Sequence, residues 1–154
     1  MKRIWIDAGK CDGCLNCTLA CMNAHRADKG SIYDLDLTDP ANESRNFIRR
    51  QPDGSYRPIF CRHCEKPECV YTCMTGAMHK NPDTGFVEYD KEKCASCYMC
   101  IMACPYGVLK SDRVEHKEIM KCNMCVHRTQ DGSPAPMCVE ICPMGAITLE
   151  EVKG

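Results

Sequence analysis

Sixteen cysteines divide this 154-residue chain into four groups of four, a pattern whose chemistry is the binding of iron. The groups are Cys11, Cys14, Cys17 and Cys21; Cys61, Cys64, Cys69 and Cys73; Cys94, Cys97, Cys100 and Cys104; and Cys122, Cys125, Cys138 and Cys142. The first and third have the spacing C-x2-C-x2-C-x3-C, in which three thiolates bind one iron–sulfur cluster and the fourth binds another. At four ligands per cluster, the cysteines predict four [4Fe–4S] clusters, which would pass single electrons from one to the next.

Zinc is the main alternative metal, and a disulfide-bonded secreted protein is the alternative class. The last group alone, Cys122 to Cys142, also fits a tetrahedral zinc site. The first and third groups favour iron–sulfur, because three closely spaced thiolates followed by a fourth are typical of it. Residues 1–10 lead straight into the first ligand without the apolar stretch of a signal peptide. We therefore expect a cytoplasmic protein whose cysteines bind metal.

The composition limits the classes of function. No apolar run is long enough for a membrane span, so direct membrane insertion is not expected. The formal net charge of −1 treats every cysteine as neutral. Four oxidised clusters would bring the charge to roughly −9, which argues against a nucleic-acid partner. The sequence has no dinucleotide-binding glycine motif, P-loop or G-x-S-x-G nucleophile. We therefore predict an electron-transfer protein that is not itself an enzyme.

Short strands must help to position these ligands. Alternating patterns predict four of them, at residues 2–7, 86–89, 113–120 and 146–150. The turn-forming run Asn81-Pro-Asp-Thr-Gly85 predicts a hairpin that joins residues 78–80 to the second of these strands.

Short helices and two loops complete the expected elements. Helices are expected near residues 18–24 and 98–103, within the first and third ligand groups. Residues 26–59 and 130–137 interrupt the ligand pattern and are predicted to be surface loops. Together the elements predict an α+β fold.

Two histidines lie next to ligands. His63 stands between Cys61 and Cys64, and His25 follows Cys21 by one helical turn. Either could donate a hydrogen bond to a cluster sulfur, which raises the reduction potential of the cluster.

The ligand groups and their order resemble the four-cluster ferredoxin-type subunits of oxidoreductases, the family of the dimethyl sulfoxide reductase iron–sulfur subunit. The resemblance is carried by CDGCLNCTLAC, CRHCEKPECVYTC, CASCYMCIMACPYG and CNMC…CVEICPMGAI, which with their order span almost the whole chain. Relatives in this family serve tungsten aldehyde oxidoreductase, carbon monoxide dehydrogenase, formate dehydrogenase and hydrogenase. The chain departs from the family at Met22 and Met74, where proline often follows the last ligand.

The resemblance implies two pseudo-symmetric lobes like bacterial ferredoxins, with short strands and helices around four cubane clusters. The outer lobe would be residues 1–25 plus 110–154, the inner lobe 61–109, and residues 26–60 a polar connecting segment. It also implies that each cluster takes its fourth ligand from another group. The implied ligand sets are Cys11, Cys14, Cys17 and Cys142; Cys122, Cys125, Cys138 and Cys21; Cys61, Cys64, Cys69 and Cys104; and Cys94, Cys97, Cys100 and Cys73.

The resemblance implies a function and partners as well. We expect a subunit that relays single electrons through four [4Fe–4S] clusters between a catalytic oxidoreductase subunit and an acceptor protein or subunit. A molybdenum or tungsten cofactor enzyme is the favoured catalytic partner, with aldehyde oxidoreductase the specific choice, and copies could stack end to end. The alternatives are a free polyferredoxin serving carbon monoxide dehydrogenase, hydrogenase or several enzymes, and a zinc-binding structural module.

Overall fold

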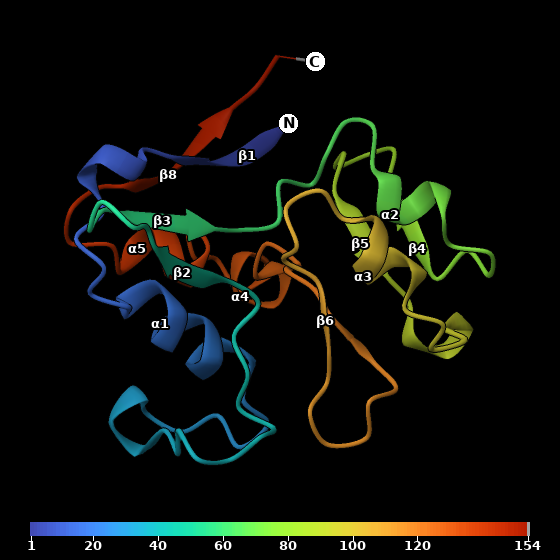
Figure 1. The fold of residues 1–154 in the computed structure, drawn as a ribbon, viewed down its shortest axis with the longest axis horizontal. Coiled ribbons are helices and arrows are strands. Elements are labelled where there is room, and N and C mark those ends of the chain that lie inside the picture. The colour runs from blue at the N-terminus through green and yellow to red at the C-terminus, as the bar shows by residue number, and fades with distance from the viewer. Residues whose placement is uncertain (154) are drawn as a thin grey trace.

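The computed structural model describes residues 1–153, which form short elements joined by ligand-bearing loops (Figure 1). Within that part of the chain, the strands form four separate two-stranded antiparallel sheets. Short strands and short helices occur together, so the expected α+β fold class is confirmed. None of the helices described is both long and apolar enough to cross a membrane.

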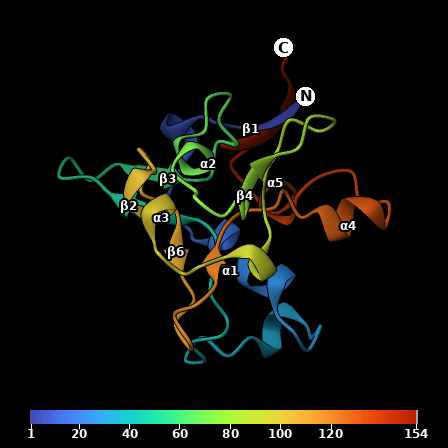
Figure 2. The ribbon, with the colours of Figure 1, turned by 90° about the vertical axis from the view of Figure 1, so that its right-hand side faces the viewer.

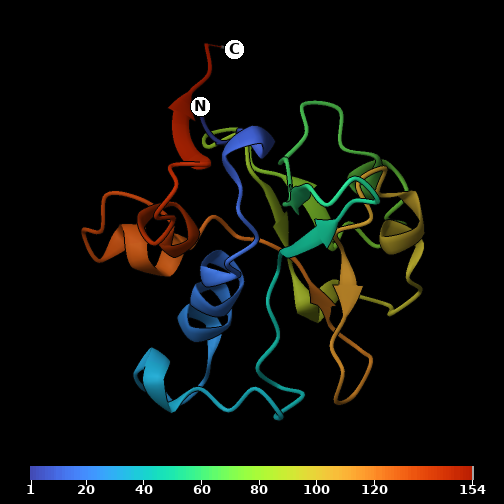
Figure 3. The same cartoon turned by 60° about the vertical axis from the view of Figure 1, so that its left-hand side comes forward.

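The two ends of the chain pair with each other. Strand β1 (Lys2–Ile6) runs antiparallel to β8 (Ile147–Glu151), with Ile4 opposite Leu149. Ile4 and the first residue of β8 are buried in one apolar cluster, which holds this sheet against the rest of the molecule. Figure 3 shows both ends of the chain at the same edge. The strands predicted near the two ends are therefore confirmed.

The hairpin predicted around Asn81 is also confirmed. Strand β4 (Met78–Lys80) pairs antiparallel with β5 (Val87–Tyr89). The Gly85 N–H donates to the Asn81 carbonyl at 2.8 Å and closes the turn. The first residue of each strand is buried in a second apolar cluster, separate from that of the chain ends.

The prediction of a surface loop over residues 26–59 is wrong for the second half of this segment. Strands β2 (Phe47–Arg50) and β3 (Tyr56–Ile59) form an antiparallel hairpin there. Successive residues of a strand point to opposite faces. Ile48 accordingly packs against the cluster of the chain ends, whereas its neighbour Phe47 packs against the cluster of β4 and β5. This hairpin therefore joins the two apolar clusters.

The helices are few-turn elements. The α-helices are α1 (Asn16–His25), α2 (Glu68–Tyr71), α3 (Met99–Ala103), α4 (Val126–Gln130) and α5 (Met137–Glu140). The 3₁₀ turns are η1 (Ala8–Lys10), η2 (Ile32–Asp34) and η3 (Lys91–Lys93). Helix α1 packs against α5, and α2 packs against α3. Figure 2 shows the molecule from the side on which α2 and α3 lie. Helices α1 and α3 confirm the two predicted helices, and a loop separates α4 from α5 as expected.

The strand predicted at residues 113–120 is mostly a loop. Only β7 (Ile119–Met120) is a strand there, and it pairs with β6 (Lys110–Ser111). The Asp112 carboxylate accepts hydrogen bonds from the five backbone N–H groups of residues 114–118, at 2.6–3.1 Å. Because these amides bond a side chain, they cannot join a sheet, which explains the error.

Two ligand groups begin with the same local structure. Strand β1 leads into η1 and strand β5 leads into η3. Asp7 and Asp90 cap these turns, each accepting a hydrogen bond from the N–H two residues later. Each turn ends immediately before the first cysteine of a group, Cys11 or Cys94. The chain therefore uses one arrangement twice to present thiols.

Candidate metal centres

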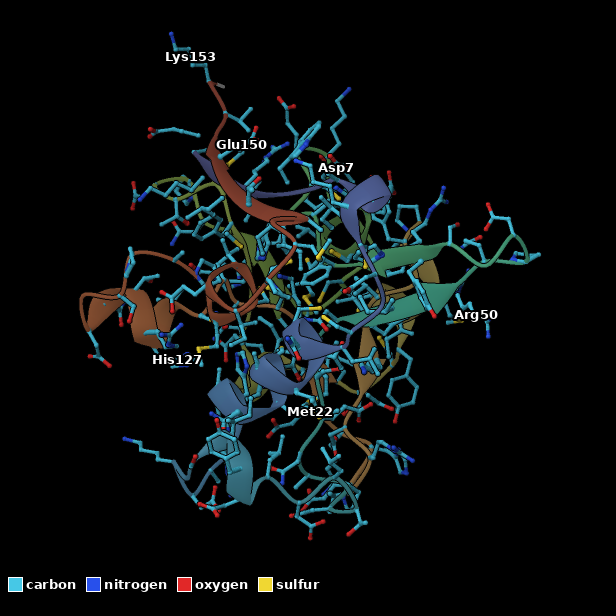
Figure 4. All side chains as sticks on the ribbon, turned by 90° about the vertical axis from the view of Figure 1, so that its left-hand side faces the viewer. Asp7, Met22, Arg50, His127, Glu150 and Lys153 are labelled. Atoms are coloured by element: carbon cyan, nitrogen blue, oxygen red, sulfur yellow. The ribbon has the colours of Figure 1, made fainter. Side chains whose placement is uncertain are left out.

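Three pockets are each lined by four cysteines from two different ligand groups. Site 1 contains Cys11, Cys14, Cys17 and Cys142; site 3 contains Cys61, Cys64, Cys69 and Cys104; and site 4 contains Cys73, Cys94, Cys97 and Cys100. Their empty volumes are alike, about 330, 350 and 310 Å³. Pockets of one size with one donor set suit one kind of bound group. In Figure 4 sulfur atoms gather in the interior, whereas Arg50, Glu150 and Lys153 point outward.

The remaining four cysteines also lie together, and we refer to them as site 2. Burial raises the pKa of Cys138, and the nearby thiols of Cys122, Cys21 and Cys125 raise it further. The thiol of Cys17 in site 1 also raises the pKa of Cys138, so sites 1 and 2 are neighbours. The three pockets and the four remaining cysteines together account for all sixteen, and each of these groupings combines two ligand groups. A zinc site made by the fourth ligand group alone would need Cys142 to lie with Cys138. Cys142 instead lines the pocket of site 1.

Each C-x3-C pair divides its two cysteines between neighbouring sites. Cys17 and Cys21 lie four residues apart on α1, over which a helix rises about 6 Å. Cys17 therefore lines site 1 while Cys21 lies in site 2. Cys138 on α5 and Cys142 just after it do the same in the opposite order. Helices α2 and α3 link sites 3 and 4 in this way.

Sites 2 and 3 meet where the second and fourth ligand groups approach each other. Burial raises the pKa of Cys122 in site 2, and the thiol of Cys61 in site 3 raises it further. Burial also raises the pKa of Cys69 in site 3. The buried ammonium group of Lys121 opposes the rise at both Cys122 and Cys69, so it lies within reach of both sites. Sites 1, 2, 3 and 4 therefore follow one another in that order.

The backbone of the ligand loops aims N–H groups at sulfurs. The residue two positions after the first cysteine of each group has a positive φ: Gly13 (76°), His63 (44°), Ser96 (53°) and Met124 (57°). The N–H of Ser96 donates to Cys94 Sγ and that of Met124 to Cys122 Sγ, each at 3.4 Å. Such bonds stabilise negative charge on sulfur and tune the potential of a bound cluster.

Binding of a metal would change the protonation state of the buried thiols. Burial raises the pKa of Cys17 to about 11 and that of Cys69 to about 11. Without a cation these thiols would stay protonated at neutral pH, whereas a bound metal stabilises the thiolate. Four sets of four cysteines match the number of donors that four [4Fe–4S] clusters need, whereas no group of three or more described His, Cys, Asp or Glu side chains is arranged to hold a single metal ion.

His63 is an independent indication of a bound group at site 3. Its Nδ1 accepts a hydrogen bond from the Val87 N–H at 3.0 Å, so the ring proton is on Nε2. Nε2 is buried without a hydrogen-bond partner among residues 1–153, and His63 is one of the residues that line the site 3 pocket. A buried donor without an acceptor is costly, and a cluster sulfur in site 3 would accept this bond.

Other polar groups also lie close to the ligands. The His25 Nδ1 lies 2.9 Å from the Cys21 carbonyl oxygen and 3.9 Å from Cys21 Sγ, so the carbonyl oxygen is the nearer of the two partners. The Arg45 N–H donates to Cys21 Sγ at 3.2 Å, and Lys121 is buried. Sequence reasoning missed Arg45 and Lys121, because tertiary contacts alone bring them to the ligands.

The loop held by Asp112 supports site 4. Ser96 Oγ donates to the Lys117 carbonyl at 2.8 Å, and the Tyr98 hydroxyl donates to the His116 carbonyl. Ser96 and Tyr98 are the neighbours of Cys97 in site 4. A change in the conformation of the Asp112 loop would therefore disturb the position of this ligand.

We predict that Asp112→Asn loosens site 4 selectively. Hydrogen bonds from four backbone N–H groups, led by that of Glu115, hold the pKa of Asp112 well below its usual range. The stabilisation is therefore fully present at neutral pH and is lost only as the pH falls through that lowered pKa. At neutral pH, anoxic oxidation in the presence of a chelator should bleach the cluster of site 4 several-fold faster in this variant than in the natural protein, as followed by electron paramagnetic resonance (EPR).

The control is Asp53→Asn, which weakens hydrogen bonds to the Ser55 N–H and Oγ in the turn of the β2–β3 hairpin. This variant should leave the bleaching of site 4 unchanged. Equal acceleration in both variants, or acceleration at all four sites, would contradict the role of the Asp112 loop.

Known proteins match this chain over most of its length. Residues 52–152 match the family described as 4Fe-4S dicluster domain. A chain of the anaerobic dimethyl sulfoxide reductase of Escherichia coli (strain K12) is 36% identical over 147 residues, which cover 93% of this chain and 70% of that relative. A subunit of the sulfite dehydrogenase of Allochromatium vinosum is 33% identical over 156 residues, which cover 92% of this chain and 65% of that relative.

A solved structure is similar as well. The active site complex BamBC of benzoyl coenzyme A reductase contains a chain that matches with a TM-score of 0.53 and 28% sequence identity. The match covers 97% of this chain and 79% of that chain. The resemblance to solved proteins therefore extends over all four ligand groups.

Proposed function

Because the chain belongs to the 4Fe-4S dicluster family and is an iron–sulfur electron-transfer subunit, we propose that it relays electrons between a catalytic oxidoreductase subunit and an acceptor through sites 1 to 4. It is not itself the catalytic subunit. Bound [4Fe–4S] clusters supply the one-electron chemistry, and the chain sets their spacing, order and surroundings. The observation that carries the proposal is the division of every C-x3-C pair between two neighbouring sites, which makes a continuous series.

We further propose that the four sites are the ligand sets of the four clusters. The first group would then share ligands with the fourth, and the second with the third. The pockets lined by four cysteines support three of these sets, and the mutual effects of the thiols on the pKa of Cys138 support site 2.

The two-lobe organisation is part of the same proposal. Residues 1–25 with 110–154 would form one lobe and residues 61–109 the other. In support, the Asp7 N–H donates to the Ala146 carbonyl at 2.8 Å, and the Asp90 N–H donates to the Ala77 carbonyl at 2.9 Å. These equivalent bonds tie each capped turn to the strand that follows a C-x3-C pair. In this proposal the hairpin of β2 and β3, which contacts both apolar clusters, would make the segment 26–60 a packed contact between the lobes rather than a tether.

We propose a stable complex with a catalytic subunit rather than a free polyferredoxin. Two relatives are named as a chain or subunit of an enzyme, and the solved relative comes from an active site complex. Apolar side chains are exposed near both ends of the series: Leu15 and Met144 line the pocket of site 1, and the exposed Met74 follows Cys73 of site 4 in the sequence. A molybdenum or tungsten cofactor enzyme remains the favoured partner, while aldehyde oxidoreductase and end-to-end stacking stay predictions.

Anoxic affinity purification with mass spectrometry of co-eluting chains tests the proposal. We expect a catalytic oxidoreductase chain in a stable complex, with about 16 iron atoms per copy of this chain from four cubanes. A monomer with the full iron content would instead support the free polyferredoxin. Zinc in place of iron would overturn the electron-transfer function.

A further inference from the structure

A buried lysine, Lys121, lies where sites 2 and 3 meet, and its burial is not needed to hold the cysteine ligands. Lys121 is only 6% exposed and lines a cleft together with His63 and Arg45. Its Nζ donates hydrogen bonds to the carbonyls of Val87 and Cys122, the latter at 2.9 Å. Burying an ammonium group is costly unless negative charge compensates for it.

No carboxylate forms an ion pair with Lys121 among residues 1–153. Both hydrogen-bond acceptors are neutral carbonyls, and none of the ion pairs of the described residues includes Lys121. Glu88 and Glu118 line the same cleft without reaching the ammonium group, and Glu118 pairs with Lys91 instead. Thiolates of sites 2 and 3, with whatever they bind, are the other anionic groups near this ammonium.

Comparison with two other lysines shows that the burial is specific. Lys10, Lys93 and Lys121 each stand immediately before the first cysteine of a ligand group. The side chains of Lys10 and Lys93 are 60% and 61% exposed, and each pairs with an aspartate three residues earlier. Lys121 alone of these three turns inward, at the place where two sites adjoin.

The neighbours of Lys121 connect it to site 3 as well as to site 2. Val87 accepts from Lys121 through its carbonyl and donates through its N–H to His63 Nδ1. One residue of β5 therefore holds both the ammonium at the junction and the ring that lines site 3. On the other side, Lys121 is bonded to the carbonyl of Cys122, a cysteine of site 2.

We propose that Lys121 is a tuning residue, whose buried ammonium group raises the reduction potentials at sites 2 and 3 together and favours electrons at the junction of the two lobes. Each added electron is a negative charge, and a buried cation stabilises it more than a hydrated surface lysine, which solvent and salt screen. This inference rests on the ligand sets proposed above.

The test is a redox titration of the anoxically purified protein, followed by EPR, in Lys121→Met and Lys121→Arg. Methionine keeps the length of the side chain but removes its charge, whereas arginine keeps the charge. Signals are assigned by their loss in one serine variant for each site: Cys14→Ser, Cys138→Ser, Cys64→Ser and Cys97→Ser. We expect Lys121→Met to lower the midpoint potentials of sites 2 and 3 and leave those of sites 1 and 4 unchanged. Lys121→Arg should retain potentials close to those of the natural protein.

Lys93→Met is the matched control, because it removes an exposed lysine at the same position relative to Cys94. Its effect on site 4 should be several-fold smaller than that of Lys121→Met on the middle sites. If Lys121→Met fails to assemble four clusters, Lys121→Gln carries the same test, since its amide can still donate to a carbonyl.

Two results would overturn the role of Lys121: unchanged potentials at sites 2 and 3, or an equal fall at all four sites. Either result can be distinguished from a failure of the proposed electron-transfer function. If the natural protein itself lacks four reversible one-electron centres, the ligand proposal fails before any lysine variant is compared.

Discussion

Replacing Cys142 with serine should remove the cluster of site 1, whereas replacing Cys138, four residues earlier in the same ligand group, should remove that of site 2. The reason is geometric. The two cysteines lie one helical turn apart at α5, and the structure places one with Cys11 and the other with Cys122. Iron should fall from about 16 towards about 12 per chain in each variant, because one cubane is lost. EPR spectra of the two reduced proteins should lack different signals.

A double variant provides the control. Cys11→Ser and Cys142→Ser should remove the same signal, and the combination should cost no more iron than either change alone, because both act on one site. Cys11→Ser with Cys138→Ser should cost the iron of two clusters. If Cys138→Ser and Cys142→Ser instead remove the same signal, the fourth group binds its own metal and the crossed ligand sets are wrong.

The positions of the ligands could be predicted from the sequence because their chemistry is local. Spacings of two residues keep Cys11 and Cys14 on one loop with Cys17 at the start of α1, and the C-x3-C step places Cys21 one helical turn further on. The hairpin after Asn81 was equally local, since turn residues and alternating strands carry its signal.

The errors came from side chains that bond backbone over a short distance or from signals that were overlooked. The alternation of residues 113–120 favours a strand, but the Asp112 carboxylate takes the amides that a sheet would need. The hairpin of β2 and β3 did have a signal. Asp53 and Gly54 form a turn between two runs rich in β-formers, and the polar composition of the segment concealed it.

The burial of Lys121 could not be predicted from the sequence at all. Lysine precedes the first cysteine of three groups, and nothing local separates the buried case from the two exposed ones. The difference arises because β5 and the fourth ligand group meet in space, where the Val87 carbonyl receives the ammonium. Tuning groups of this kind depend on tertiary contacts, whereas ligands are marked by their own residue type.

Removal of all clusters should unfold the chain rather than leave an empty form of this fold. Four of the five α-helices described have only four or five residues, and each sheet has only two strands. Neither kind of element is stable by itself in water. Cysteines belong to both apolar clusters, with Cys17 and Cys138 in one and Cys100 in the other. The sites are therefore part of the core, and metal binding is part of folding.

The expected magnitude follows from comparing free energies. Structural metal sites contribute of the order of 10 kcal/mol in zinc-binding peptides, and the net stability of a domain is about 5–15 kcal/mol. Loss of four sites would exceed any remaining stability. Anoxic oxidation in the presence of a chelator should abolish most of the far-ultraviolet circular dichroism and expose the chain to protease, and added iron and sulfide should restore both. The same chelator without oxidant, which leaves the iron bound, is the control. An iron-free chain that still protected the amides of β1 and β8 from hydrogen exchange would show that the chain ends pair without the clusters, and that the fold does not depend on them.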